Sequence, residues 1–239
     1  MTITHLTDDT NSSSASSYNT ASISPGSNDL IIVTVVSRTG TSTNPNQPTL
    51  SGNGLTYEVI DGDVFDNTSS SRRRETKFRA MGVSPSSGAI SISFGGQTQT
   101  TCTWSIEKVS GDVDTSGANG SGAIKQSAIN SDRNSWTADS PKTLTVTLPS
   151  APDSNNIVLA TFGFGDDSQT QSGDAAYTEL SNISSGVDGA SVGILAQYAQ
   201  TTNQTVEATA SFETEICGIA IEIQAAATTP KGIPLKGVS

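Results

Sequence analysis

The residue types that could carry chemistry are few and widely separated in this chain. His5 is the only histidine, and it lies in a polar stretch at the start of the sequence. Nucleophilic catalysis of the Ser-His-Asp or Cys-His type needs an imidazole beside the nucleophile. The two cysteines, Cys102 and Cys217, show no spacing typical of zinc ligands. We therefore expect neither a nucleophilic triad nor a zinc site.

Paired carboxylates are the one catalytic arrangement that the sequence could contain. Glu107 and Glu222 follow similar apolar runs in the two halves of the chain, and a glycosidase needs two carboxyl groups about 5–10 Å apart. Each glutamate interrupts an alternating apolar strand, so we expect both side chains to point into solvent. Aromatic residues, which often line sugar clefts, make up only 5% of the chain. We predict that the protein is not an enzyme and has no catalytic residues.

Two acidic segments contain carboxylates of the kind that bind calcium. One is Asp61-Gly62-Asp63-Val64-Phe65-Asp66-Asn67, and the other begins at Asp112-Val113-Asp114. The second lacks the acidic residue that closes a calcium-binding loop, since Ala123 occupies that position. We expect acidic turns without an ion, and we predict no cofactor and no metal.

Basic and aromatic residues supply the candidate contact sites. The candidate docking residues are Arg72, Arg73, Arg74, Lys77 and Arg79, together with Lys231 and Lys236 near the end of the chain. A solvated loop is the alternative interpretation of the first group.

Trp136 lies in a polar segment and is the candidate glycan contact. Trp104 and Tyr57 lie within strand patterns, and we expect them to be buried or half-buried.

The elements that position these residues follow a pattern that occurs twice. The run Asn28–Val35 matches Asn155–Phe162 in residue type, and Cys102–Glu107 matches Cys217–Glu222. Short apolar or alternating runs separated by Gly, Pro and Asn turns predict β-strands throughout. The cysteines fall at equivalent places in this repeat, which favours two buried thiols over a disulfide.

The predicted fold is all-β, a jelly-roll-like antiparallel β-sandwich built from two related halves. Two tandem β-sandwich domains are the alternative. Residues 1–13 are predicted to form a polar N-terminal arm, and residues 14–226 to form the sandwich. Its halves cover about 14–111 and 140–226, joined by a linker at 112–139. Residues 227–239 are predicted to form a C-terminal tail that lies against a neighbour or is loose.

Charge and composition exclude some partners. The net charge is −11 and the pI is near 4.3, so nucleic-acid phosphates would repel the chain and we predict no nucleic-acid partner. No apolar stretch reaches the roughly 18 residues of a membrane helix, and we predict no membrane contact. The first ten residues lack the pattern of a secretory signal, which favours assembly inside a cell.

Several predicted strand segments carry a family resemblance, namely Asp29–Val33, Gly54–Tyr57, Phe78–Ala80, Ala89–Phe94, Trp104–Glu107 with Val109–Gly111, Asn156–Ala160, Ala176–Leu180 and Ile219–Ile223. Their order resembles jelly-roll-like sandwich modules of phage virion proteins and of bacterial surface and secreted proteins. The resemblance implies a non-enzymatic structural protein of a viral particle, assembled in the host cytoplasm. The role that it implies is a phage capsid decoration or head-associated protein docked on the major capsid lattice, as a homo-oligomer or lattice-bound copy. The alternative is a carbohydrate- or receptor-binding module of a phage tail or bacterial surface protein, with a glycan as partner.

Overall fold

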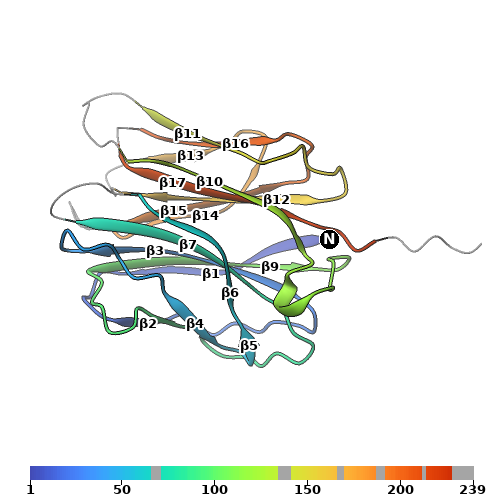
Figure 1. Cartoon of the computed structure of the whole chain (residues 1–239), viewed down its shortest axis with the longest axis horizontal. Helices are drawn as coiled ribbons and strands as arrows, with labels where there is room; N and C mark the ends of the chain where they lie inside the picture. Colours follow the sequence, from blue (N-terminus) through green and yellow to red (C-terminus); the bar gives the residue numbers. More distant parts are fainter. Residues whose placement is uncertain (66–70, 134–140, 166–169, 187–191, 212–213, 228–239) are drawn as a thin grey trace, which may run out of the picture.

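The chain folds into four antiparallel β-sheets (Figure 1). The computed structural model describes residues 1–65, 71–133, 141–165, 170–186, 192–211 and 214–227. Within these ranges the only helical element is a short 3-10 turn, η1 (Ala118–Gly120). No helix among them is long and apolar enough to cross a membrane. The all-β prediction is confirmed.

The first half of the chain forms one large and one small sheet. The large sheet has the strand order β1-β9-β3-β7-β6, and the small sheet has the order β2-β8-β4-β5. The strands of this half are β1 (Thr2–Asn11), β2 (Ser17–Asn19), β3 (Leu30–Thr39), β4 (Thr49–Gly52), β5 (Leu55–Thr56), β6 (Glu58–Val64), β7 (Arg72–Ala80), β8 (Ser91–Ser93) and β9 (Thr101–Ser110).

The second half also forms a large and a small sheet. The large sheet runs β10-β17-β12-β15-β14, and the small sheet runs β11-β16-β13. The strands of this half are β10 (Ile124–Asp132), β11 (Lys142–Thr147), β12 (Ile157–Phe164), β13 (Gln171–Gly173), β14 (Thr178–Ser184), β15 (Gly193–Ala199), β16 (Thr205–Ala210) and β17 (Ile216–Ile223).

The two large sheets share one topology. When β3 is matched to β12, the order of neighbouring strands is the same in both sheets. Register irregularities also fall on matching strands, in β1 and β10 at one edge and in β6 and β14 at the other. Shared ancestry of the halves stays a prediction, whereas their common strand order is a property of the structure.

The sheets stack as four layers, with the two large sheets in the middle and the small sheets outside (Figure 1). One hydrophobic cluster fills each half between its own two sheets, around Trp104 in the first half and Phe162 in the second. Two further clusters lie between the large sheets and join the halves. We call this inter-half interface the seam.

Burial explains the hydrophobic pattern of each strand. β12 is buried along its whole length because another sheet covers each face of its own sheet, and its sequence is correspondingly continuous in apolar residues. β11 lies in an outer sheet and alternates between buried and exposed residues. The exposed positions of β11 are Thr143, Thr145 and Thr147, so hydroxyl groups cover this outer face.

Two parts of the predicted layout are wrong. Residues 2–11 are not a free arm, because they form β1 and pair with β9. The predicted linker at 112–139 contains β10, which pairs with β17. Of the predicted tail, Ala227 alone lies within the described residues.

Candidate functional site: the seam and its cleft

The seam packs the two halves around an approximate two-fold axis. Thr34 of β3 and Thr161 of β12 occupy matching positions in the two halves, and their hydroxyl oxygens lie 3.4 Å apart. Val36 and Gly163 also match, and a Cβ added to Gly163 would lie 2.9 Å from Val36 Cγ2. Contacts between β1 and β14 have their counterpart in contacts between β10 and β6. Contact between equivalent residues is the mark of an isologous interface.

A buried pair of opposite charges lies at the centre of the seam. Glu75 and Lys77 project from β7 and are both fully buried. Lys77 Nζ donates a hydrogen bond of 2.7 Å to the carbonyl oxygen of Ile219. Glu75 accepts hydrogen bonds of 2.8 Å from Thr161 Oγ1 and 3.1 Å from the Gly163 amide. The first half therefore supplies the charges, and the second half supplies the groups that solvate them.

Burial shifts both of these groups toward their neutral forms. Desolvation raises the pKa of Glu75 to about 7, although Lys77 and the hydrogen bonds from Thr161 and Gly163 oppose this shift. Desolvation lowers the pKa of Lys77 to about 8, opposed by Glu75 and Glu107. Burial therefore disfavours the charged form of each group.

Glu107 is a second buried carboxylate of the seam, so the prediction that it points into solvent is wrong. It is fully buried and accepts a short hydrogen bond from Ser105. His5 Nδ1 lies 3.4 Å from Glu107 Oε1. The hydrogen bond to Glu107 raises the pKa of His5, while burial works in the opposite direction.

Glu222 is also fully buried, which contradicts the same prediction, but it lies on the other face of its sheet. Its neighbours Ile221 and Ile223 pack into the seam, so the alternation of a strand turns Glu222 away from it. Glu222 Oε1 accepts hydrogen bonds of 2.6 Å from Asn156 Nδ2 and 2.9 Å from the Asp153 amide. Burial acts to raise the pKa of Glu222, but these hydrogen bonds outweigh it and the pKa is lowered.

The strand register explains why the two glutamates differ. Thr34 pairs with Ser105, whereas the matching Thr161 pairs with Ile219. With Ser105 matched to Ile219, Glu107 corresponds to Ile221 rather than to Glu222. A shift of one residue moves a side chain to the opposite face of a sheet. The structure therefore does not bring the two predicted carboxylates together.

The same shift separates the cysteines. Cys102 packs in the core of the first half, whereas Cys217 packs in the seam beside Val36 and Phe65. Both are buried and free, as expected, although they are not at equivalent positions. Burial raises the pKa of both thiols, which disfavours the reactive thiolate.

The predicted basic docking loop is part of strand β7. Lys77 is fully buried, and Arg73 is buried with Nη1 3.5 Å from Glu215 Oε2, so neither is available for docking. Arg74 donates from Nε to the carbonyl oxygen of Pro45 at 2.9 Å. Docking through Arg72, Arg74 and Arg79, which are half-buried, stays a prediction. The candidates Trp136, Lys231 and Lys236 lie outside the described residues.

The acidic segments considered for calcium have protein partners. Asp63 lies in β6 and accepts hydrogen bonds of 2.8 and 2.7 Å from Arg133 Nη2, which links β6 to the end of β10. Asp114 accepts hydrogen bonds from the Ser116 amide at 2.7 Å and from Gln224 Nε2 at 3.0 Å. In the described part of the chain, no three His, Cys, Asp or Glu residues are grouped as metal ligands would be.

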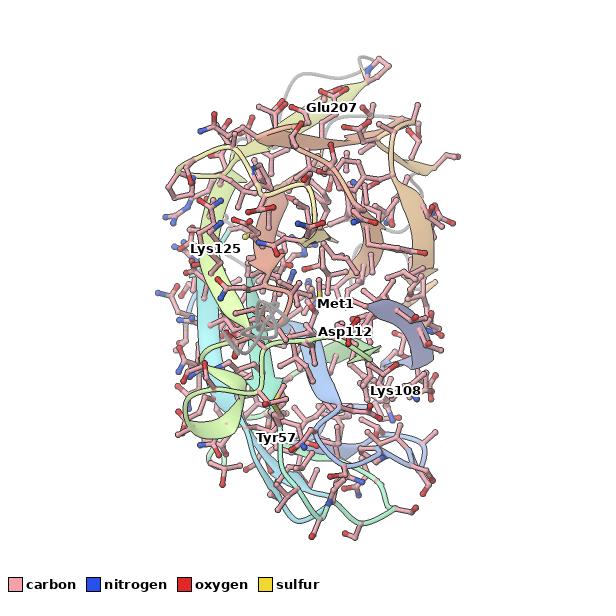
Figure 2. The ribbon with its side chains drawn as sticks, turned by 90° about the vertical axis from the view of Figure 1, so that its right-hand side faces the viewer. Met1, Tyr57, Lys108, Asp112, Lys125 and Glu207 are labelled. Carbon is pink, nitrogen blue, oxygen red and sulfur yellow. The ribbon has the colours of Figure 1, made fainter. Side chains whose placement is uncertain are left out.

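A polar cleft of about 650 Å³ opens at one end of the seam. Figure 2 faces this end, with Met1 and Asp112 between the two halves and Lys125 above them. Sequence reasoning missed the cleft because its walls come from strand ends and turns that are distant in the chain. The described residues that line the cleft are Met1, Asp112, Lys125, Asp153, Asn155, Asn156, Gln200, Gln224 and Ala225–Ala227.

Internal hydrogen bonds hold the walls of the cleft. Gln200 Nε2 donates to the carbonyl oxygen of Ser154 at 2.9 Å. The Ala225 amide donates to Asn156 Oδ1 at 2.9 Å, and the Asn155 amide donates to Asp153 Oδ1 at 3.2 Å. These contacts order the turn before β12 and hold it against the residue that follows β15 and the segment that follows β17.

Comparison with known proteins leaves the structure as the main guide to function. No family model, no curated protein and no solved structure matches the chain. The all-β, antiparallel part of the predicted resemblance agrees with the structure.

Proposed function

We propose that the protein is a non-enzymatic structural component of a viral particle, specifically a phage capsid decoration or head-associated protein. One observation carries the proposal: the seam joins four sheets into a single stack through buried charges and apolar clusters. Interlocking of this kind suits a rigid module that withstands mechanical load on a larger assembly. Exposed threonines of β11 give one outer sheet a hydroxyl-rich, hydrophilic surface.

Attachment to the lattice is proposed to use the C-terminal segment. Residues 228–239 follow directly on Ala227 and include Lys231 and Lys236. At about 3.3–3.6 Å per residue, a segment of this length reaches at most about 40 Å. A tether of that reach can hold the stack to a subunit.

The test is to locate the protein in purified particles by mass spectrometry and electron microscopy. The full chain should be particle-bound, and a variant that ends at Ala227 should be released while it keeps its melting temperature. If the protein is absent from particles, the proposed function is wrong. If the shortened variant remains bound, the tether is wrong.

A further inference from the structure

The seam cleft has the size and lining of a binding site for a small polar molecule. Its volume of about 650 Å³ lies within the range of about 300–1,000 Å³ that is usual for small-molecule sites. Both halves of the chain contribute to its walls, Met1 from the first half and Asn155, Gln200 and Gln224 from the second. The cleft therefore exists only when the two halves are packed together.

The lining offers mainly hydrogen-bond acceptors on supports that are already ordered. Asp112 and Asp153 supply carboxylate oxygens. Gln200 and Gln224 each use Nε2 to bind the wall, and within the described residues their Oε1 atoms accept no hydrogen bond. Polar groups held in place before a ligand arrives lose little conformational freedom on binding.

We propose that the seam cleft binds a neutral saccharide, of the size of a monosaccharide or disaccharide. Sugar hydroxyl groups donate hydrogen bonds, and carboxylate and amide oxygens such as those of Asp112, Asp153 and Gln224 accept them. The amide of Asn155 both donates and accepts, which matches a hydroxyl group that does the same. This proposal does not depend on the virion assignment, because the isolated protein carries the cleft.

The charges around the cleft set its selectivity. Asp112 and Asp153 lie in the lining, and the buried Glu222 lies behind it. Lys125 is the only basic side chain among the described lining residues, and its Nζ is 3.5 Å from Glu222 Oε1. The lining also holds the α-ammonium group of Met1, so two cationic groups balance Asp112 and Asp153. With Glu222 behind them, no net positive charge remains to hold a sialylated, sulfated or phosphorylated sugar. Neutral sugars should therefore bind in preference to acidic ones.

The test is a glycan array probed with the full chain, followed by calorimetric titration of the strongest neutral saccharide. Asp112 is exposed, so Asp112→Ala should remove an acceptor without unfolding the protein and should weaken binding about tenfold. Ala227→Trp adds bulk at the mouth of the cleft while removing no described side-chain hydrogen bond, and it should abolish binding. Glu207→Ala is the matched control, because Glu207 is an exposed carboxylate on a small outer sheet (Figure 2).

The proposal is overturned if no neutral saccharide binds the wild-type chain. It is also overturned if acidic glycans bind better than neutral ones, if Ala227→Trp binds as the wild type does, or if Glu207→Ala loses as much affinity as Asp112→Ala. Loss of neutral-saccharide binding in 0.5 M salt would show that ionic contacts carry the binding and would equally contradict the proposal. Circular dichroism of each variant separates loss of the site from loss of the fold.

Discussion

Lys77 is the residue on which the seam depends most. It is fully buried, and it links the two halves by its hydrogen bond to Ile219. Its charge also offsets that of Glu75 two positions earlier on β7. A buried pair of this kind adds little net stability, but removing one partner leaves the other buried without an opposite charge.

Replacing Lys77 alone should therefore be costly. We expect Lys77→Met to lower the free energy of unfolding by about 3 kcal/mol, because Glu75 remains buried without its partner. The double variant Glu75→Gln/Lys77→Met should recover most of this loss. Lys108→Met is the control, since Lys108 is partly exposed and its Nζ is 3.8 Å from Asp29, and it should cost less than about 1 kcal/mol. Urea unfolding measures all four proteins, and a smaller effect for Lys77→Met than for Lys108→Met would contradict the assignment.

The same pair predicts an unusual dependence of stability on pH. The folded state raises the pKa of Glu75 from 4.5 to about 7, so it binds the proton more tightly than the unfolded state does. The contribution of Glu75 to stability therefore falls as pH rises from about 4.5 to 7. The folded state lowers the pKa of Lys77 from 10.5 to about 8, so its contribution rises between about pH 8 and 10.5.

Unfolding free energies measured across this range should reveal the effect of the pair. The free energy of unfolding of the wild type minus that of Glu75→Gln/Lys77→Met should pass through a minimum between about pH 7 and 8. The double variant corrects for the other titrating groups, which both proteins share. A difference that does not change with pH would show that the pair does not titrate as its burial implies.

At the scale of elements, the sequence predicts the apolar central strands well and the edge strands poorly. The basic start of β7, an interior strand, is also missed. β3 and β12 read as continuous apolar runs because sheets cover both of their faces. β1 and β10 are edge strands of the large sheets, and each contains a register irregularity that breaks the period of two. Their polar sequences therefore resemble an arm and a linker.

The candidate site was predictable only in part, for a related reason. Repetition in the sequence indicates two similar halves, but an alignment of Cys102–Glu107 with Cys217–Glu222 is one residue away from the register of the sheets. That single step decides which glutamate faces the seam. The cleft depends on how the halves pack, which no local pattern encodes.

Deleting residues 1–11 tests the role of β1. Ile3 is buried in the seam cluster, and Ser181 of β14 donates a hydrogen bond of 2.5 Å to Asp8 across the seam. We expect the deletion to lower the free energy of unfolding by at least about 3 kcal/mol and Tm by about 10 °C. A variant that ends at Ala227 is the control, and its Tm should change by less than about 2 °C. Equal effects of the two deletions would contradict the placement of β1.

At the scale of the whole molecule, the seam makes the two halves one unit. Apolar clusters flank the central charges, and side chains from both halves contribute to each cluster. The proposed mechanical role and the proposed cleft both require that the halves stay together. A protein whose halves opened independently would have neither a rigid stack nor a complete cleft.

Calorimetric unfolding of the full chain near pH 6 tests this claim most directly. If the seam couples the halves, the heat-capacity scan shows one transition, and the calorimetric enthalpy equals the van't Hoff enthalpy. Two resolved transitions, or a calorimetric enthalpy near twice the van't Hoff value, would show that the halves unfold independently and would contradict the account.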